Sequence, residues 1–145
     1  MATSQPHPPD DFEASFETLA GRGSEFTDAF YARLFERYPE LEPKFSGVLL
    51  AHQGAMLMSA LGIVAATTQR RQMAADAYLK VLGHRHYLRD IAVEDYGKFK
   101  AVLLETMGNQ LGAAWNPPLE AAWDAALDHA IETMRKGHRE GPVIY

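Results

Sequence analysis

The sequence contains no cysteine, and this absence excludes several kinds of site at once. Disulfide scaffolds, cysteine-ligated zinc, iron–sulfur clusters and thiol nucleophiles all need that side chain. An excess of positive charge is also missing, because 14 lysines and arginines face 19 aspartates and glutamates, for a net charge of -5. Such a chain has no basic field to draw it to nucleic acid or to an anionic membrane surface. We therefore expect a cytoplasmic protein that binds neither.

Long hydrophobic runs are missing as well. The longest apolar stretch, 55–66, is interrupted by Ser59 and is shorter than the roughly 20 residues that cross a bilayer. The first residues, MATSQPHPPDD, have no basic start, apolar run or cleavage pattern of a targeting peptide. No GxGxxG, P-loop or GxSxG elbow is present. The usual signatures of dinucleotide binding, phosphoryl transfer on a P-loop and serine hydrolysis are therefore absent.

What the sequence does contain is a set of apolar stripes with a spacing close to four, which is the helical period. The stripes are Tyr31, Leu34, Phe35 and Tyr38; Leu57, Leu61 and Val64; Tyr96, Phe99, Leu103, Met107 and Leu111; and Leu119, Trp123, Ala126, Ala130 and Met134. No segment alternates with the period of two that a half-buried strand requires. The pattern predicts an all-α fold of six or seven helices.

Turn and cap signals divide these helices. The turns are expected at 21–23, 39–47, 70–71, 90–91 and 116–118, with Ser24 and Asn116 as helix caps. Three prolines before residue 10 predict a mobile tail over 1–9, followed by one domain over 10–137 and a C-terminal tail over 138–145 with no assigned function. Gly54 and Gly62 lie inside a helical pattern, which predicts that a neighbouring helix backbone approaches closely on that face.

Three polar side chains are placed on apolar faces by their spacing. Tyr78, Leu82 and His86 step by four, so His86 lies on the buried face, while His84 is turned about 200° from it. Gln53, Leu57 and Leu61 also step by four, which turns Gln53 inward and His52 away. Tyr31 carries a hydroxyl on its stripe. Each could equally be a core residue with a satisfied hydrogen bond.

An ordered set of segments resembles the globin family, most closely the single-domain bacterial haemoglobins and the globin domain of flavohaemoglobins. The likeness covers about residues 12–137. The segments are Phe30 to Glu40, Pro43-Lys44-Phe45, Gln53, Leu57, residues 61–63, Leu82-Gly83-His84-Arg85-His86, Tyr96, and Trp123 in the last helix. The resemblance implies a globin fold of six to eight helices around a pocket for haem b, which is iron protoporphyrin IX.

The resemblance also implies a role for each matching residue. His86 would be the proximal iron ligand, a task that suits neutral imidazole. The cofactor would be lined by Phe45, Leu57, Leu82 and Tyr96, with Phe45 packed on the porphyrin face. The distal, ligand-binding side would consist of Tyr31, Gln53 and Leu57.

The function implied is reversible binding of dioxygen, CO and NO at a pentacoordinate iron. A hydroxyl from Tyr31, supported by Gln53, should stabilise bound dioxygen by about 1.5–3 kcal/mol, which corresponds to about 10- to 150-fold in affinity. Oxygen transport or storage, or oxidation of NO to nitrate, would follow. No reductase domain follows residue 137, so we expect a separate reductase, and the protein would be a monomer or a homodimer.

The sequence departs from flavohaemoglobins behind the proximal histidine. Tyr96 matches one tyrosine of their network, but the glutamate position falls at or near His138 and a second tyrosine position at Leu127. This departure weakens the expectation of peroxidase-like chemistry.

Three alternatives stay open. A register slip of one would turn His52 toward the iron and make the protein hexacoordinate. A haem-based gas or redox sensor would use the same fold. A helical interaction module without haem would need His86 and Gln53 only as core residues.

Overall fold

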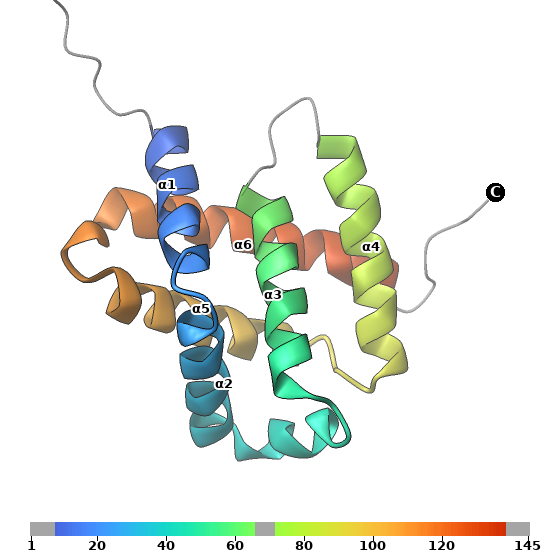
Figure 1. Ribbon diagram of the computed structural model, residues 1–145. Coiled ribbons are helices and arrows are strands. Elements are labelled where there is room, and N and C mark those ends of the chain that lie inside the picture. The colour runs from blue at the N-terminus through green and yellow to red at the C-terminus, as the bar shows by residue number, and fades with distance from the viewer. Residues whose placement is uncertain (1–7, 66–71, 139–145) are drawn as a thin grey trace, which may run out of the picture.

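The computed structural model describes residues 8–65 and 72–138, and this part of the chain is helical with no strand. Its elements are α1 (Pro8–Ala20), α2 (Glu25–Arg37), the 3-10 helix η1 (Pro39–Phe45), α3 (Leu50–Ala65), α4 (Gln72–Leu88), α5 (Asp95–Leu111), the short 3-10 helix η2 (Gly112–Ala114) and α6 (Pro117–His138). In Figure 1, α6 crosses behind α3 and α4, and both pack on it. The all-α prediction is confirmed.

Most helix boundaries follow the signals in the sequence. Asn116 caps α6 as predicted, because its Oδ1 accepts a hydrogen bond from the amide of Leu119 at 2.9 Å. Ser24 stands at the N-cap of α2 but makes no side-chain cap bond; its hydroxyl instead donates to Asp28. The expected turn at 70–71 lies outside the described residues.

The boundaries between the helical domain and both expected tails differ in the structure. Pro8 and Pro9 belong to α1 rather than to a tail, because proline is tolerated in the first turn of a helix, where its missing amide proton has no partner to lose. His138 ends α6 and is buried, with 7% of its surface exposed. The final helix therefore extends one residue beyond the expected domain end and brings His138 into the fold.

The core lies where α1, α2, α5 and α6 meet. Trp123 is completely buried, and its indole nitrogen donates to the hydroxyl of Ser15 on α1 at 2.9 Å. Phe12 packs against the same indole with ring centroids 4.3 Å apart. These contacts fasten the first helix to the last, and the predicted stripe on α5 is buried at Tyr96, Leu103, Met107 and Leu111.

Close approaches at glycine occur in two forms. A side chain at Gly54 would meet the Thr27 side chain of α2 at 2.8 Å, and one at Gly62 would meet the Phe16 ring of α1 at 3.1 Å. Both neighbours are side chains, so the prediction that a helix backbone approaches at these two glycines is wrong. Backbone-to-backbone approach occurs instead at Gly83, where an added Cβ would overlap the main chain of Met134.

No single helix among the described residues is long and apolar enough to cross a membrane. By length and composition alone, the bent pair Pro39–Phe45 and Leu50–Ala65 passes the same test.

Candidate functional site

Tyr31 and Gln53 meet on one side of the candidate site. Tyr31 on α2 is buried, with 5% of its surface exposed, and it faces the half-buried side chain of Gln53 on α3. Burial raises the pKa of Tyr31 to about 12, although Gln53 acts in the opposite direction. The hydroxyl therefore keeps its proton at neutral pH and is available as a donor.

Aromatic rings pack around the ring of Tyr31. Phe45, at the end of η1, lies 5.7 Å from the Tyr31 ring and 5.3 Å from Phe35, measured between centroids. Phe99 on α5 lies 6.4 Å from Phe45 and equally far from Phe30. A pocket of about 340 Å³ opens to solvent next to Phe35 and Phe45. The Phe45 side of the site is therefore apolar and partly accessible.

The structure also decides the register of α3. The side chain of Gln53 faces Tyr31, whereas His52 is exposed. Leu57, one turn after Gln53, is half-buried and packs against the core. These positions match the expected register and do not support the slip that would turn His52 inward. We refer to Tyr31, Phe45, Gln53 and Leu57 as the distal wall.

His86 lies in the last turn of α4. Its Nδ1 atom is buried and has no hydrogen-bond partner among the described residues. Burial, with a smaller contribution from the charge of His138, lowers the pKa of His86 to about 4. The imidazole is therefore neutral at pH 7, which is the form that binds a metal ion.

Tyr96 and His138 form a polar pair beside His86. The Tyr96 ring lies 5.7 Å from the His86 ring, and its hydroxyl lies 2.7 Å from Nδ1 of His138. Burial raises the pKa of Tyr96 to about 12, so the hydroxyl holds its proton and can donate to that nitrogen. Leu82, one turn before His86, is half-buried against the core. We refer to Leu82, His86, Tyr96 and His138 as the proximal wall.

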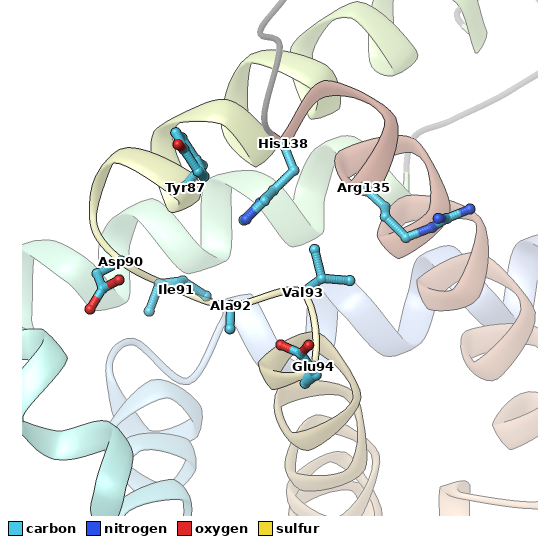
Figure 2. Close-up of a pocket in the computed structure, with 8 residues that line it drawn as sticks. All are labelled: Tyr87, Asp90, Ile91, Ala92, Val93, Glu94, Arg135 and His138. Carbon is cyan, nitrogen blue, oxygen red and sulfur yellow. The ribbon is translucent and has the colours of Figure 1, made fainter.

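A second pocket reaches the proximal wall from solvent. Its volume is about 350 Å³, and Figure 2 shows the His138 ring directed into it while Arg135 points away. The pocket is lined by Tyr87, Asp90, Ile91, Ala92, Val93, Glu94, Arg135 and His138. Solvent therefore approaches His138, whereas Nδ1 of His86 stays buried.

His84 has a structural partner of its own. It lies off the face that carries His86, as predicted, and its Nδ1 is 3.2 Å from the backbone carbonyl of His138. It therefore points toward α6, and it helps to hold the end of that helix in place.

The helices that carry Gln53 and His86 differ in their main neighbours, although both touch α6. α4 packs most extensively on α6, and α3 packs on α2 and α1. Gly83 and Gly137 allow the backbones of α4 and α6 to touch, at Met134 and Lys80 respectively. Each of these two helices is thus supported mainly by a different part of the fold.

These residues fit a haem group. Within 8–65 and 72–138, no three histidine, aspartate or glutamate side chains gather as a metal site, so a bare ion held by protein ligands alone finds no support there. A single neutral imidazole with an unpaired buried nitrogen suits an iron whose other ligands come from a porphyrin. The aromatic side chains near Phe45 offer a flat apolar surface to such a ring.

Sequence reasoning missed two parts of the site. The sequence predicts a tail from His138 onward, and the resemblance indicates only that the glutamate position of the flavohaemoglobin network falls at or near this residue. Phe99 was identified only as part of a core stripe. In both cases the missing information is a contact between residues distant in sequence, 42 positions apart for Tyr96 and His138.

Comparison with known proteins gives a consistent result. The family model described as Globin matches residues 28–134. An uncharacterized globin-like protein of Aquifex aeolicus is 30% identical over 118 residues, with 80% of this chain and 81% of that protein covered. Globin CTT-VIIB-4 of Chironomus thummi thummi is 27% identical, with 69% and 70% covered.

One solved structure matches the fold closely. The bacterial globin from Campylobacter jejuni superposes with a TM-score of 0.78 at 20% identity, and the match covers 90% of this chain and 94% of that one.

Proposed function

This chain belongs to the globin family and is a haem-binding globin that resembles bacterial haemoglobins; from that premise we propose that His86 ligates the iron of haem b and that the protein reversibly binds diatomic gases. Phe45, Leu57, Leu82 and Tyr96 would line the cofactor. When bound, haem supplies a ferrous iron with an open position for dioxygen, CO or NO.

The observation that carries the gas-binding proposal is the buried Tyr31, which faces Gln53. Dioxygen gains negative charge when it binds, and a hydroxyl donor stabilises that charge most where water is excluded. Burial keeps Tyr31 protonated, and Gln53 places a second polar side chain beside it. Leu57 contributes no polar atom, so it shapes the distal wall and keeps it dry.

The physiological role that fits this wall best is oxygen transport or storage in the cytoplasm by a monomer or homodimer. Oxidation of NO to nitrate is the second role that we consider, and it requires a separate reductase. The polar pair of Tyr31 and Gln53 serves both roles, because both need dioxygen to be retained.

Haem titration of the purified protein tests the cofactor assignment. We expect wild type to take up one haem and to show a strong Soret band with distinct ferric, ferrous and CO-bound spectra. The variant His86→Ala should lose that band, because its ligand is gone. His52→Ala is the matched control, since His52 is an exposed histidine, and its spectra should equal those of wild type. Full haem content in His86→Ala would refute the assignment.

The variant Tyr31→Phe tests the distal assignment. It removes only the hydroxyl, so dioxygen should dissociate about 10- to 150-fold faster, as expected for the loss of about 1.5–3 kcal/mol. CO is less polar, and its dissociation should change far less. Equal dioxygen dissociation rates in wild type and Tyr31→Phe would exclude this role for the hydroxyl.

A further inference from the structure

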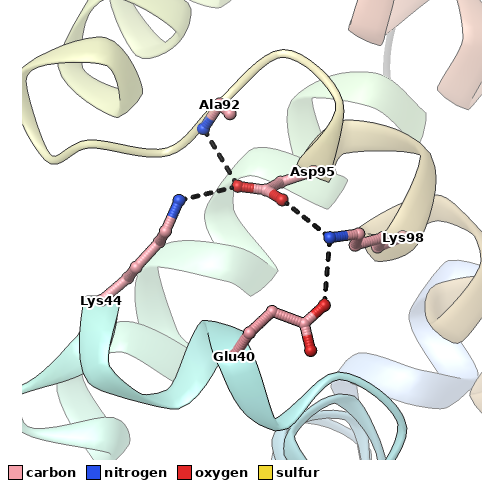
Figure 3. Close-up of polar contacts among 5 residues, drawn as sticks. All are labelled: Glu40, Lys44, Ala92, Asp95 and Lys98. Carbon is pink, nitrogen blue, oxygen red and sulfur yellow. Dashed lines mark hydrogen bonds and ion pairs between the residues drawn. The ribbon is translucent and has the colours of Figure 1, made fainter.

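A buried carboxylate joins two segments on the rim of the candidate site. Asp95, the first residue of α5, has only 4% of its surface exposed. It accepts hydrogen bonds from the Lys44 ammonium at 3.0 Å, the Ala92 amide at 3.0 Å and the Lys98 ammonium at 3.2 Å. Lys98 also bonds Glu40 at 3.1 Å, so η1 is tied to α5 twice (Figure 3).

The carboxylate stays charged in this setting. Burial alone would raise the pKa of Asp95, but the hydrogen bonds from Lys44, Ala92 and Lys98 outweigh it and lower the pKa overall. A buried ion pair is weak evidence of a gain in stability, because apolar residues of similar size often stabilise a fold as well. What distinguishes the Lys44–Asp95 ion pair is therefore that it joins two different segments of the chain.

Those segments belong to the two walls. Lys44 directly precedes Phe45 of the distal wall. Ala92 follows Ile91, whose amide donates to the carbonyl of His86 at 2.9 Å. The contacts therefore run from the Phe45 segment through Asp95 to the end of α4, where His86 lies. Lys44 and Asp95 are 51 residues apart in sequence, so their ion pair joins segments that are distant along the chain.

We propose that Lys44, Asp95 and Ala92 form a clasp that holds the Phe45 segment against the end of α4 and thereby slows the loss of haem. The proposal rests on the proposed function, in which Phe45 and His86 hold the cofactor. On that assignment, haem would leave more easily when Phe45 and His86 move apart, and the clasp opposes that movement at the rim. Asp95 is in this sense a positioning residue that acts through its neighbours.

Transfer of haem from the reconstituted protein to excess apomyoglobin measures this effect. We expect Lys44→Met and Asp95→Asn each to lose haem about tenfold faster than wild type, which equals about 1.4 kcal/mol. The double variant should lose haem no faster than the faster single variant, because both changes open the same clasp. Lys44→Met keeps the test decisive if Asp95→Asn folds poorly, since Lys44 lies at the partly exposed end of the pair.

Lys100→Met is the matched control. Lys100 is also a lysine on α5 with ion pairs, to Asp124 and Asp128 of α6, but it contacts neither rim segment. Its haem-loss rate should stay within about twofold of the wild-type rate. Urea unfolding of the haem-free variants compares the unfolding free energy that Lys44→Met and Lys100→Met each lose. Equal haem-loss rates in Lys44→Met and wild type would overturn the clasp.

The two proposals fail in different ways. Haem uptake that persists in His86→Ala would overturn the proposed function. Normal uptake through His86, combined with haem loss that no clasp variant accelerates, would overturn only the clasp.

Discussion

The distal and proximal walls are fixed in different ways. The distal wall is packed by side chains, with the Phe45, Tyr31 and Phe35 rings in mutual contact. The proximal wall is fixed by main chain, because Gly83 lets the backbone of α4 touch that of α6. Side chains can shift by rotating, whereas touching backbones cannot. From this difference we expect the distal wall to adjust more readily than the proximal wall.

Replacing single glycines by alanine should lower the free energy of unfolding by very different amounts near the two walls. At Gly83 a Cβ would overlap the main chain of Met134, so Gly83→Ala should lower the free energy of unfolding by about 3 kcal/mol or more. At Gly54 the nearest atom is the Thr27 hydroxyl at 2.8 Å, which can rotate, so the loss should be about 1 kcal/mol.

Urea unfolding of the haem-free protein measures both changes. Gly97→Ala is the control, because no neighbour lies within 4 Å of that site, and alanine should stabilise the helix by up to about 1 kcal/mol. A cost at Gly54 equal to that at Gly83 would remove the distinction between the walls.

The contrast also separates what the sequence could predict from what it could not. The spacing of apolar residues predicts the helices and the inward faces of Tyr31, Gln53 and His86, because a helix places every fourth residue on nearly the same side. The structure agrees with each of these placements. The spacing of residues along the chain is therefore sufficient to predict this part of the site.

Contacts between residues distant in sequence cannot be predicted from the spacing of apolar residues. Nothing in the local pattern pairs Tyr96 with His138, or Lys44 with Asp95, because each pair is brought together by the packing of whole helices. The same holds for Gly83 and Met134, which meet only because α4 and α6 cross at that point. The resemblance to globins indicates the position of His138, whereas its hydrogen bond with Tyr96 is seen only in the structure.

Alkaline pH should weaken the distal wall through Tyr31. The pKa of Tyr31 is about 12 in the folded protein and about 10 in an unfolded chain. The stability associated with the protonated hydroxyl is fully present below pH 10 and is lost as pH rises through 12, because the unfolded state releases the proton first. The loss amounts to about 2–3 kcal/mol at most.

Unfolding free energies of the haem-free protein between pH 9 and 11 test this expectation. Wild type should lose stability above pH 10 more steeply than Tyr31→Phe, which has no proton to release at that position. Parallel pH profiles would show that the buried hydroxyl ionises as easily as a free tyrosine.

The smallest effect concerns the polar pair of the proximal wall. Tyr96→Phe leaves Nδ1 of His138 unpaired, and His138→Leu leaves the Tyr96 hydroxyl unpaired, so each should cost about 1–2 kcal/mol of unfolding free energy. The double variant should cost about 1 kcal/mol less than the sum, because it leaves no partner stranded. His129→Leu, on the exposed side of α6, should change stability by less than about 0.5 kcal/mol. The rate of dioxygen dissociation should change far less in Tyr96→Phe than in Tyr31→Phe, because the Tyr96 hydroxyl is directed at His138. A larger change in Tyr96→Phe would mean that the proximal wall also governs ligand retention.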